Sequence, residues 1–178
     1  MSTFIICASG QSLTQDDVDY CRGKGTVIVT NNTYELAPWA DVLWGCDEVW
    51  WEKYPEAMDF KGRKISVQYS EVEQIQTLDR PGLGLEQVHT GGNGGYQAIN
   101  WAYLQGATKI VMLGFDMHGT HWHGKHKRGL GNVHNFKAWI PAFGRLAKDL
   151  ERQGVDVINC TPGTALHCFK KQDLRETI

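Results

Sequence analysis

The sequence is poor in proline, lacks long apolar runs and holds an odd number of cysteines, and each feature excludes a class of protein. Five prolines against twenty glycines, without a repeat or biased tract, argue against collagen-like, solenoid and disordered chains. No stretch of about 18 apolar residues is present, so no membrane-spanning helix is expected. The apolar run at 3–8 is too short and lacks the basic flanks of a signal peptide, which predicts a cytoplasmic protein.

The cysteines are widely spaced and contain no Cys-x-x-Cys pair. This pattern is typical of reduced thiols rather than of a disulfide framework or a zinc knuckle. The five residues are Cys7, Cys21, Cys46, Cys160 and Cys168.

Acidic residues are absent from one long segment, although the net charge of -2 is near zero and argues against general nucleic-acid binding. Residues 117–148 contain six Lys or Arg and five of the seven histidines. A positive region of this kind favours an anionic ligand such as a nucleotide or a sugar phosphate. A solvated basic face is the alternative reading.

Short β-branched runs alternate with helical segments, which predicts a parallel α/β sheet in one domain over 1–178. Most runs are apolar throughout, as strands covered on both faces should be. Strands are expected at 3–8, 26–30, 41–45, 64–67, 109–113 and 155–159. Helices are expected at about 95–105 and after His134, where an apolar stripe repeats at three- and four-residue spacing. Pro141 predicts that the regular part of this second helix starts just before it, or kinks there.

Three segments that can carry chemistry lie beside predicted strands or helices. In open α/β sheets, ligands bind outside the carboxyl ends of the strands, so the segments are expected to converge. The first, Ser9–Leu13, follows the first strand, where Gly10 and the Ser12 hydroxyl could approach a phosphate. The second holds four glycines in five residues, at 91–95, and opens a helix, which favours ligand binding by Gly92, Asn93 and Gly94 over a flexible hinge. Neither segment matches the Walker or dinucleotide-binding pattern.

The third segment begins at Gly114 and Asp116 and continues through a loop rich in histidine and glycine. Four histidines in nine residues, at 118–126, suggest a metal site, but their spacing is not that of a helical ligand pair and the run is too glycine-rich to be preorganised. The favoured interpretation is a mobile lid over about 117–134 that closes on an anionic ligand, with a plain solvated loop as the alternative.

Polar residues after two other strands are expected to reach the same crevice: Asn31 and Asn32 after the second, and Asp47 after the third. Turn-forming asparagine is the alternative for the first two. Most of the seven tryptophans are expected in the core, and Trp122 is the one expected to stack on a ligand.

In sequence order, ASGQSL, TNNTYE, GGNGGYQAINWAYLQG and TKIVMLGFDM, followed by a late histidine, resemble small phage proteins known as norphogenetic or hypothetical proteins. Behind them stand two enzyme families with the same fold. One is the Campylobacter-type sialyltransferases, which transfer sialic acid from CMP, and the other is the 6-hydroxymethylpterin pyrophosphokinase-like (MptE-like) group. The resemblance implies a Rossmann-like, doubly wound, mostly parallel sheet. It also implies a location in the host cytoplasm if the chain is phage-encoded.

The resemblance to the sialyltransferases implies roles for particular residues. Gly10 and Ser12 fall in the turn that binds the nucleotide phosphate, and Asn31 matches an asparagine that holds the nucleotide sugar. Asp47 and Asn93-Gly94 fall where that family has Asn and Ser-Gly. Gly114 and Asp116 match its Gly-Ile-Asp near the ribose.

The catalytic base of that family is a lid histidine, for which His134 is the best-placed candidate and His126 the second. Imidazole suits the task because its ordinary pKa, about 6.5, lets it accept a proton from a hydroxyl at neutral pH. The family's lid tyrosines have no counterpart here, so Lys125, Lys127, Arg128 or the histidines would stabilise the leaving phosphate.

These observations predict a transferase that binds a nucleotide or nucleotide-sugar and works without a metal, with His134, Asp116 and His126 as candidate catalytic residues. One alternative is a pyrophosphokinase-like enzyme, with Asp47 and Asp116 holding Mg²⁺. Another is a non-catalytic phage module that binds a nucleotide. The sequence leaves the oligomeric state open, a homo-oligomer included.

Overall fold

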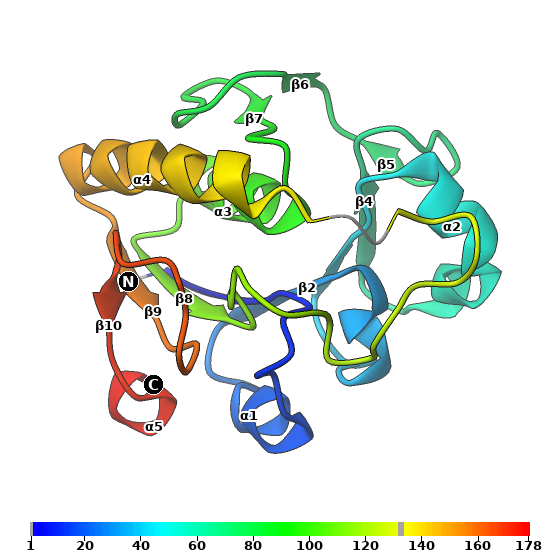
Figure 1. Cartoon of the computed structure of the whole chain (residues 1–178), viewed down its shortest axis with the longest axis horizontal. Helices are drawn as coiled ribbons and strands as arrows, with labels where there is room; N and C mark the ends of the chain where they lie inside the picture. The colour runs from blue at the N-terminus through cyan, green and yellow to red at the C-terminus, as the bar shows by residue number, and fades with distance from the viewer. Residues whose placement is uncertain (1, 132–133) are drawn as a thin grey trace.

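A computed structural model describes residues 2–131 and 134–178. Eight parallel strands form one twisted sheet with helices on both faces (Figure 1). Their order across the sheet is β10-β9-β8-β1-β2-β3-β4-β5. The strands are β1 (Thr3–Cys7), β2 (Thr26–Thr30), β3 (Val42–Trp44), β4 (Arg63–Ser66), β5 (Glu73–Gln74), β8 (Lys109–Leu113), β9 (Asp156–Asn159) and β10 (Lys170–Lys171).

Helices cover the two faces of this sheet in separate groups. In Figure 1, α3 (Gly94–Leu104) and α4 (Phe136–Arg152) lie on one face, and α1 (Gln15–Tyr20) and α5 (Leu174–Thr177) on the other. The second face is completed by α2 (Glu48–Lys53), which packs in the same apolar cluster. Short pieces complete the chain: β6 (Thr77–Leu78), β7 (Val88–His89) and two 3₁₀ turns, η1 (Asn31–Glu35) and η2 (Pro55–Asp59).

Alternation along each central strand divides the core into two apolar clusters. In β1, Phe4 and Ile6 join the cluster under α3 and α4, whereas Ile5 and Cys7 join the cluster under α1 and α2. Both sets are buried, which explains why the central strands are apolar throughout. The doubly wound α/β fold expected from the sequence is therefore confirmed.

The six predicted strands and both predicted helices are present, with bounds that differ by one residue at most ends. Gly106 and Gly154, with φ of 85° and 72°, follow the ends of α3 and α4 and terminate these helices. Pro141 lies inside α4, which begins five residues earlier, at Phe136. It is the sixth residue of the helix, so it removes the N–H that would pair with the Lys137 carbonyl, and the helix continues through this missing hydrogen bond.

The chain changes direction across the sheet beside β1. From β1 the strands proceed through β2 to β5 on one side, whereas β8, β9 and β10 follow one another on the other side. In sheets of this kind, ligands bind at the carboxyl ends of the strands where the order reverses. The fold therefore points to the loops after β1 and β8.

Candidate functional site

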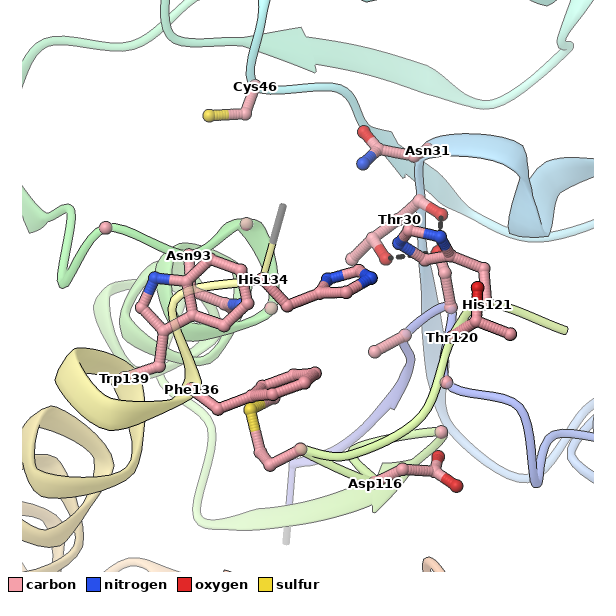
Figure 2. Close-up of a pocket in the computed structure, with 18 of the residues that line it drawn as sticks. Thr30, Asn31, Cys46, Asn93, Asp116, Thr120, His121, His134, Phe136 and Trp139 are labelled. Atoms are coloured by element: carbon pink, nitrogen blue, oxygen red, sulfur yellow. Dashed lines mark hydrogen bonds between the residues drawn. The ribbon is translucent and has the colours of Figure 1, made fainter. Parts of the chain in front are cut away.

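A cavity of about 290 Å³ lies at this reversal point, beyond the carboxyl ends of β1, β2, β3 and β8 (Figure 2). Ten of the predicted site residues line it: Gly10, Asn31, Asp47, Gly92, Asn93, Gly94, Gly114, Asp116, His126 and His134. Segments separated by more than a hundred residues thus meet around one space. Three predicted site residues, Ser12, Lys125 and Arg128, are not in its lining.

Ser12 has a different role from the phosphate contact predicted for it. Its backbone N–H and its hydroxyl both donate to the Asp116 carboxylate, at 3.1 and 2.9 Å. The N–H of Gly10 likewise donates to the carbonyl of Gly114, at 2.8 Å. The donors of the turn after β1 therefore bond to other protein groups. Asp116, which is buried, holds this turn against the end of β8.

Lys125 and Arg128 are exposed on the histidine-rich loop, outside the cavity. The charged group of a side chain stays in water unless a bonding partner compensates for the loss of hydration. Among the described residues, no Lys or Arg lines the cavity. Positive charge for an anionic ligand would have to come from elsewhere.

The N-terminus of α3 supplies a second kind of positive group. The Asn93 side chain caps the helix by accepting from the N–H of Tyr96, at 3.1 Å. Among the described residues, none accepts a hydrogen bond from the N–H groups of Gly94 and Gly95, which open the helix. Unpaired donors at the positive end of a helix dipole bind anions.

Gly94 differs from its neighbouring glycines in what surrounds it. A Cβ on Gly91 would meet the Tyr96 ring at 2.6 Å, and one on Gly95 would meet the Phe115 ring at 2.6 Å. A Cβ on Gly94 would meet only Trp44, at 4.0 Å. Internal packing therefore explains the other two glycines but not Gly94, which lines the cavity.

Two backbone conformations at the cavity are uncommon. Asn31 and Met117, with φ of 46° and 56°, are the non-glycine residues with positive φ among those described, and both line the cavity. Asparagine tolerates this region, whereas methionine is rarely found there. Such strain gathers at functional sites.

Sequence reasoning missed several lining residues. Phe136 and Trp139 belong to the apolar stripe of the helix after His134, which was expected to be buried, but both line the cavity at the start of α4. Their place at the start of that stripe was the available signal. Thr30, Cys46 and His121 are further lining residues.

Two aromatic and amide predictions are wrong in detail. Trp122 does not line the cavity: its indole N–H donates to the Thr33 hydroxyl, at 3.2 Å, and its ring packs on the core. Asn32 is buried, where it accepts from the Trp50 indole at 3.0 Å and donates to Glu35. Both residues therefore pack outside the cavity and support the residues that line it.

The loop that bears the histidines is anchored rather than loose. His121 forms backbone bridges with Gly10 and Gly124, and the N–H of Trp122 donates to the carbonyl of Ser9, at 3.0 Å. Further along, Lys127 donates to the carbonyl of Lys53 at 2.8 Å. These contacts attach this part of the predicted lid to the rest of the protein, while Asn132 and Val133 lie outside the described residues.

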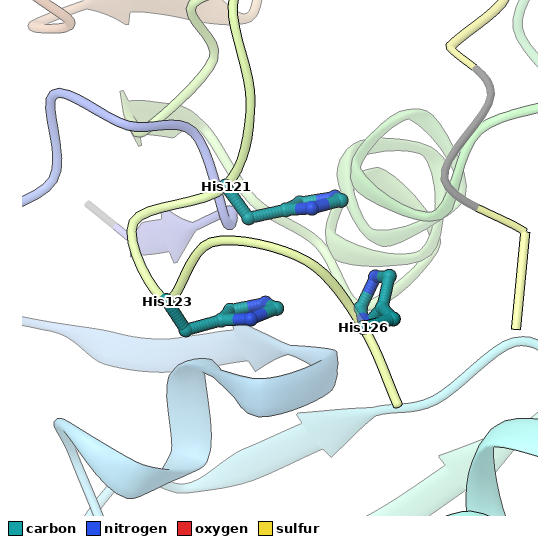
Figure 3. Close-up of side chains that lie close together, drawn as sticks. All are labelled: His121, His123 and His126. Atoms are coloured by element: carbon teal, nitrogen blue, oxygen red, sulfur yellow. The ribbon is translucent and has the colours of Figure 1, made fainter. Parts of the chain in front are cut away.

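Three imidazoles of this loop face one another (Figure 3). The rings of His121 and His123 stack with centroids 5.0 Å apart, and those of His121 and His126 lie 4.4 Å apart. Burial, and then the neighbouring imidazoles, lower the pKa of each of the three to about 4. At neutral pH the three are therefore uncharged, the form in which imidazole nitrogen accepts a proton or binds a metal.

His134 lies in the centre of the cavity in Figure 2, between Trp139 and His121. Its ring stacks on Phe136, with centroids 5.0 Å apart and planes at 10°. The ring of His121 is 4.9 Å away. Two aromatic neighbours thus hold a titratable ring inside the site.

Comparison of the chain with protein-family models, curated proteins and solved structures finds no match. Among the described residues, the helices are all too short or too polar to cross a bilayer. The fold and site together define a doubly wound α/β protein with a cavity at its strand reversal.

Proposed function

We propose that the cavity binds a nucleotide or a nucleotide-sugar and that the protein transfers a group from it to an acceptor hydroxyl. The observation that carries this proposal is the start of α3. There the N–H groups of Gly94 and Gly95 have no acceptor among the residues that the structure describes, and Gly94 lines the cavity without a packing reason for lacking a side chain. A phosphate oxygen accepts from such donors. The position beside β1 and β8 is where doubly wound sheets bind nucleotides.

The transfer step is assigned to His134 as general base. A neutral imidazole would accept the proton of the acceptor hydroxyl as that oxygen attacks the transferred group, and the nucleotide would leave with its phosphate held at α3. His126, the second candidate, belongs to the group of three imidazoles instead. Asp116 is a positioning residue, since its carboxylate holds the turn after β1.

A magnesium-dependent pyrophosphokinase receives less support. Magnesium prefers carboxylate and water ligands, yet Asp116 already accepts two hydrogen bonds from Ser12. A nucleotide-binding module without catalysis would share the same cavity, and turnover distinguishes it from the transferase.

Titration calorimetry with CMP, CDP, CTP, ATP and GTP, each with magnesium and with EDTA, tests the proposal. Micromolar binding of a mono- or diphosphate that survives EDTA is expected. Binding restricted to triphosphates with magnesium would favour the pyrophosphokinase, and the absence of all binding would refute the proposal.

Two variants locate the binding and the chemistry. Gly94→Ala should fold normally, since no protein atom lies within 3.4 Å of its new methyl group, and should weaken nucleotide binding at least about tenfold, or 1.4 kcal/mol. Gly144→Ala, in α4 and away from the cavity, is the matched control. His134→Ala should retain binding and lose turnover. Loss of binding instead would make His134 a ligand residue.

A further inference from the structure

The group of three imidazoles is a cluster that the proposed transfer does not use. His121, His123 and His126 each offer a nitrogen, and these nitrogens all lie within 4.8 Å of one another. In the described part of the chain, no other group of three or more His, Cys, Asp or Glu side chains is so arranged. Imidazole nitrogen is the commonest protein ligand of zinc and related transition metals.

Two nitrogens of this group lack the hydrogen-bond partner that buried polar atoms normally have. Nδ1 of His121 and Nε2 of His123 are shielded from water and have no hydrogen-bond partner among the described residues. Buried polar atoms are nearly always paired, and an ion that is not part of a structure is one of the recognised reasons for an exception. A single cation between the rings would give both nitrogens a partner.

The spacing requires little adjustment to accept an ion. Zinc–nitrogen bonds of about 2.0–2.1 Å at tetrahedral angles place ligand nitrogens about 3.4 Å apart. The nitrogens of the three rings lie within 4.8 Å of one another, so a bound ion would draw the rings somewhat closer together. The backbone that carries them is held by the bridges of His121 with Gly10 and Gly124.

We propose that His121, His123 and His126 bind one divalent transition-metal ion of the zinc class. Three protein ligands leave a coordination position open, as in catalytic rather than structural zinc sites. His121 and His126 line the cavity and His123 lies behind them, so the ion would sit in the cavity wall. Its open position is then available to water or to an oxygen of an anionic ligand.

Such an ion would supply the positive charge that the cavity lining lacks. No described lining residue is Lys or Arg. In Figure 2, Asn93 at the start of α3 and His121 lie on opposite sides of His134. This site goes beyond the metal-independent transferase that the sequence predicts. It does not rest on the proposed function, because the metal alone is the probe.

The test uses the full chain without a polyhistidine tag, after treatment with a chelator, titrated with Zn²⁺ and with Co²⁺. One equivalent should bind, the melting temperature should rise, and Co²⁺ should give the intense visible d–d bands of a four- or five-coordinate site. The variant His123→Ala, which leaves the cavity lining intact, should weaken binding more than about 100-fold, the upper range for losing a residue that only supports a ligand.

Two further variants keep the result interpretable. His118→Ala is the control, since His118 lines the cavity outside the group of three and pairs with the carbonyl of Gly163, and its affinity should match that of the wild type. His126→Gln repeats the test at a second ligand should His123→Ala fail to fold. Failure of the wild type to bind Zn²⁺ and Co²⁺ at micromolar concentrations, or equal affinity in His126→Gln, would overturn the proposal. Nucleotide titration in EDTA reports on the proposed function separately.

Discussion

The cavity has two walls that are built from different chemical groups. The first, the glycine wall, consists of Gly10, Gly94, Gly95 and Gly114 and presents backbone groups at strand and helix ends. The second, the histidine wall, consists of His121 and His126 with His123 behind them and presents side chains of one loop. Within the first wall, the N–H groups of Gly94 and Gly95, which have no acceptor among the described residues, suit a phosphate. Clustered imidazoles suit a metal ion or a proton.

The two walls also depend on different parts of the molecule. The glycine wall is continuous with the central strands β1 and β8, which pair along their whole length. The histidine wall depends on a few attachments of a loop, chiefly Trp122, whose ring packs on the core cluster beneath. The arrangement of the glycine wall should therefore be lost only when the whole protein unfolds. The arrangement of the histidine wall should be open to disruption without unfolding the protein.

The largest effect is expected from a methyl group in the glycine wall. Gly10→Ala would place a Cβ in overlap with the Asp116 carboxylate and with the carbonyl of Gly114. Because this overlap involves buried groups and backbone, the free energy of unfolding should fall by about 3 kcal/mol, the upper range for overpacking. Urea denaturation measures it.

Gly144→Ala is the matched control for that substitution. Apart from its chain neighbours and the backbone of its own helix, no described atom lies within 4 Å of the added methyl group. The residue is inside α4, so the variant should be more stable by about 0.5–1 kcal/mol. Equal stabilities for the two variants would contradict the close packing described at Gly10.

A smaller and local effect is expected from the anchor of the histidine wall. Trp122→Ala removes a half-buried ring and its hydrogen bond to Thr33, and should cost about 1–2 kcal/mol, below the range for fully buried tryptophan. The three imidazoles should then lose their alignment, so Co²⁺ binding should weaken about 10-fold or more, as for lost supporting residues.

Measuring nucleotide affinity in the same variant tests whether the two walls act independently. Affinity for a nucleotide in EDTA should be retained in Trp122→Ala, because the start of α3 is untouched. Trp122→Phe, which keeps a ring but not the indole N–H, should fall between the wild type and Trp122→Ala. Parallel loss of metal and nucleotide binding would show that the walls are one unit.

The smallest effect concerns Cys46, which lines the cavity between the walls. Burial, and then the Asp47 carboxylate, raise the pKa of this thiol to about 12. Since only the thiolate reacts, alkylation of Cys46 by iodoacetamide should be slow at pH 8 and rise about tenfold per pH unit up to pH 10. Peptide mapping by mass spectrometry follows it.

Cys168 is the internal control for that reaction. It is exposed, so it should be labelled before Cys46, and Cys7, Cys21 and Cys160, which are buried, should react only after unfolding. A plateau in the Cys46 rate near pH 9 would show that its thiol ionises as an exposed thiol does.

Much of the fold could be predicted from the sequence because strands buried on both faces are apolar at every position. Apolar runs such as Thr26–Thr30 and Lys109–Leu113 need no knowledge of their neighbours to be identified as central strands. Between β4 and α3 the sequence carries only a weak pattern, because the strands β5, β6 and β7 in this region have two residues each. Pieces that short carry no periodicity.

The site could be predicted only where position along a strand or helix determines direction. Gly10, Asn31, Asp47 and Gly114 follow strands, and residues in such positions reach the carboxyl edge of the sheet. Trp122 was expected at the ligand and Trp139 in the core, and the structure has them the other way round. Packing with distant segments decides which side of a loop or of a helix start meets the cavity.

The sequence by itself determined the central strands of a parallel α/β sheet, the glycines at the start of α3 and the richness of one loop in histidine, since each is a property of consecutive residues. The tertiary structure alone decided that Ser12 serves Asp116, that Lys125 and Arg128 point to water, and that three histidines converge. These outcomes depend on contacts between segments far apart in the chain. Such contacts contribute free energy only once the chain has folded, because only then are groups buried away from water and donors placed beside their acceptors.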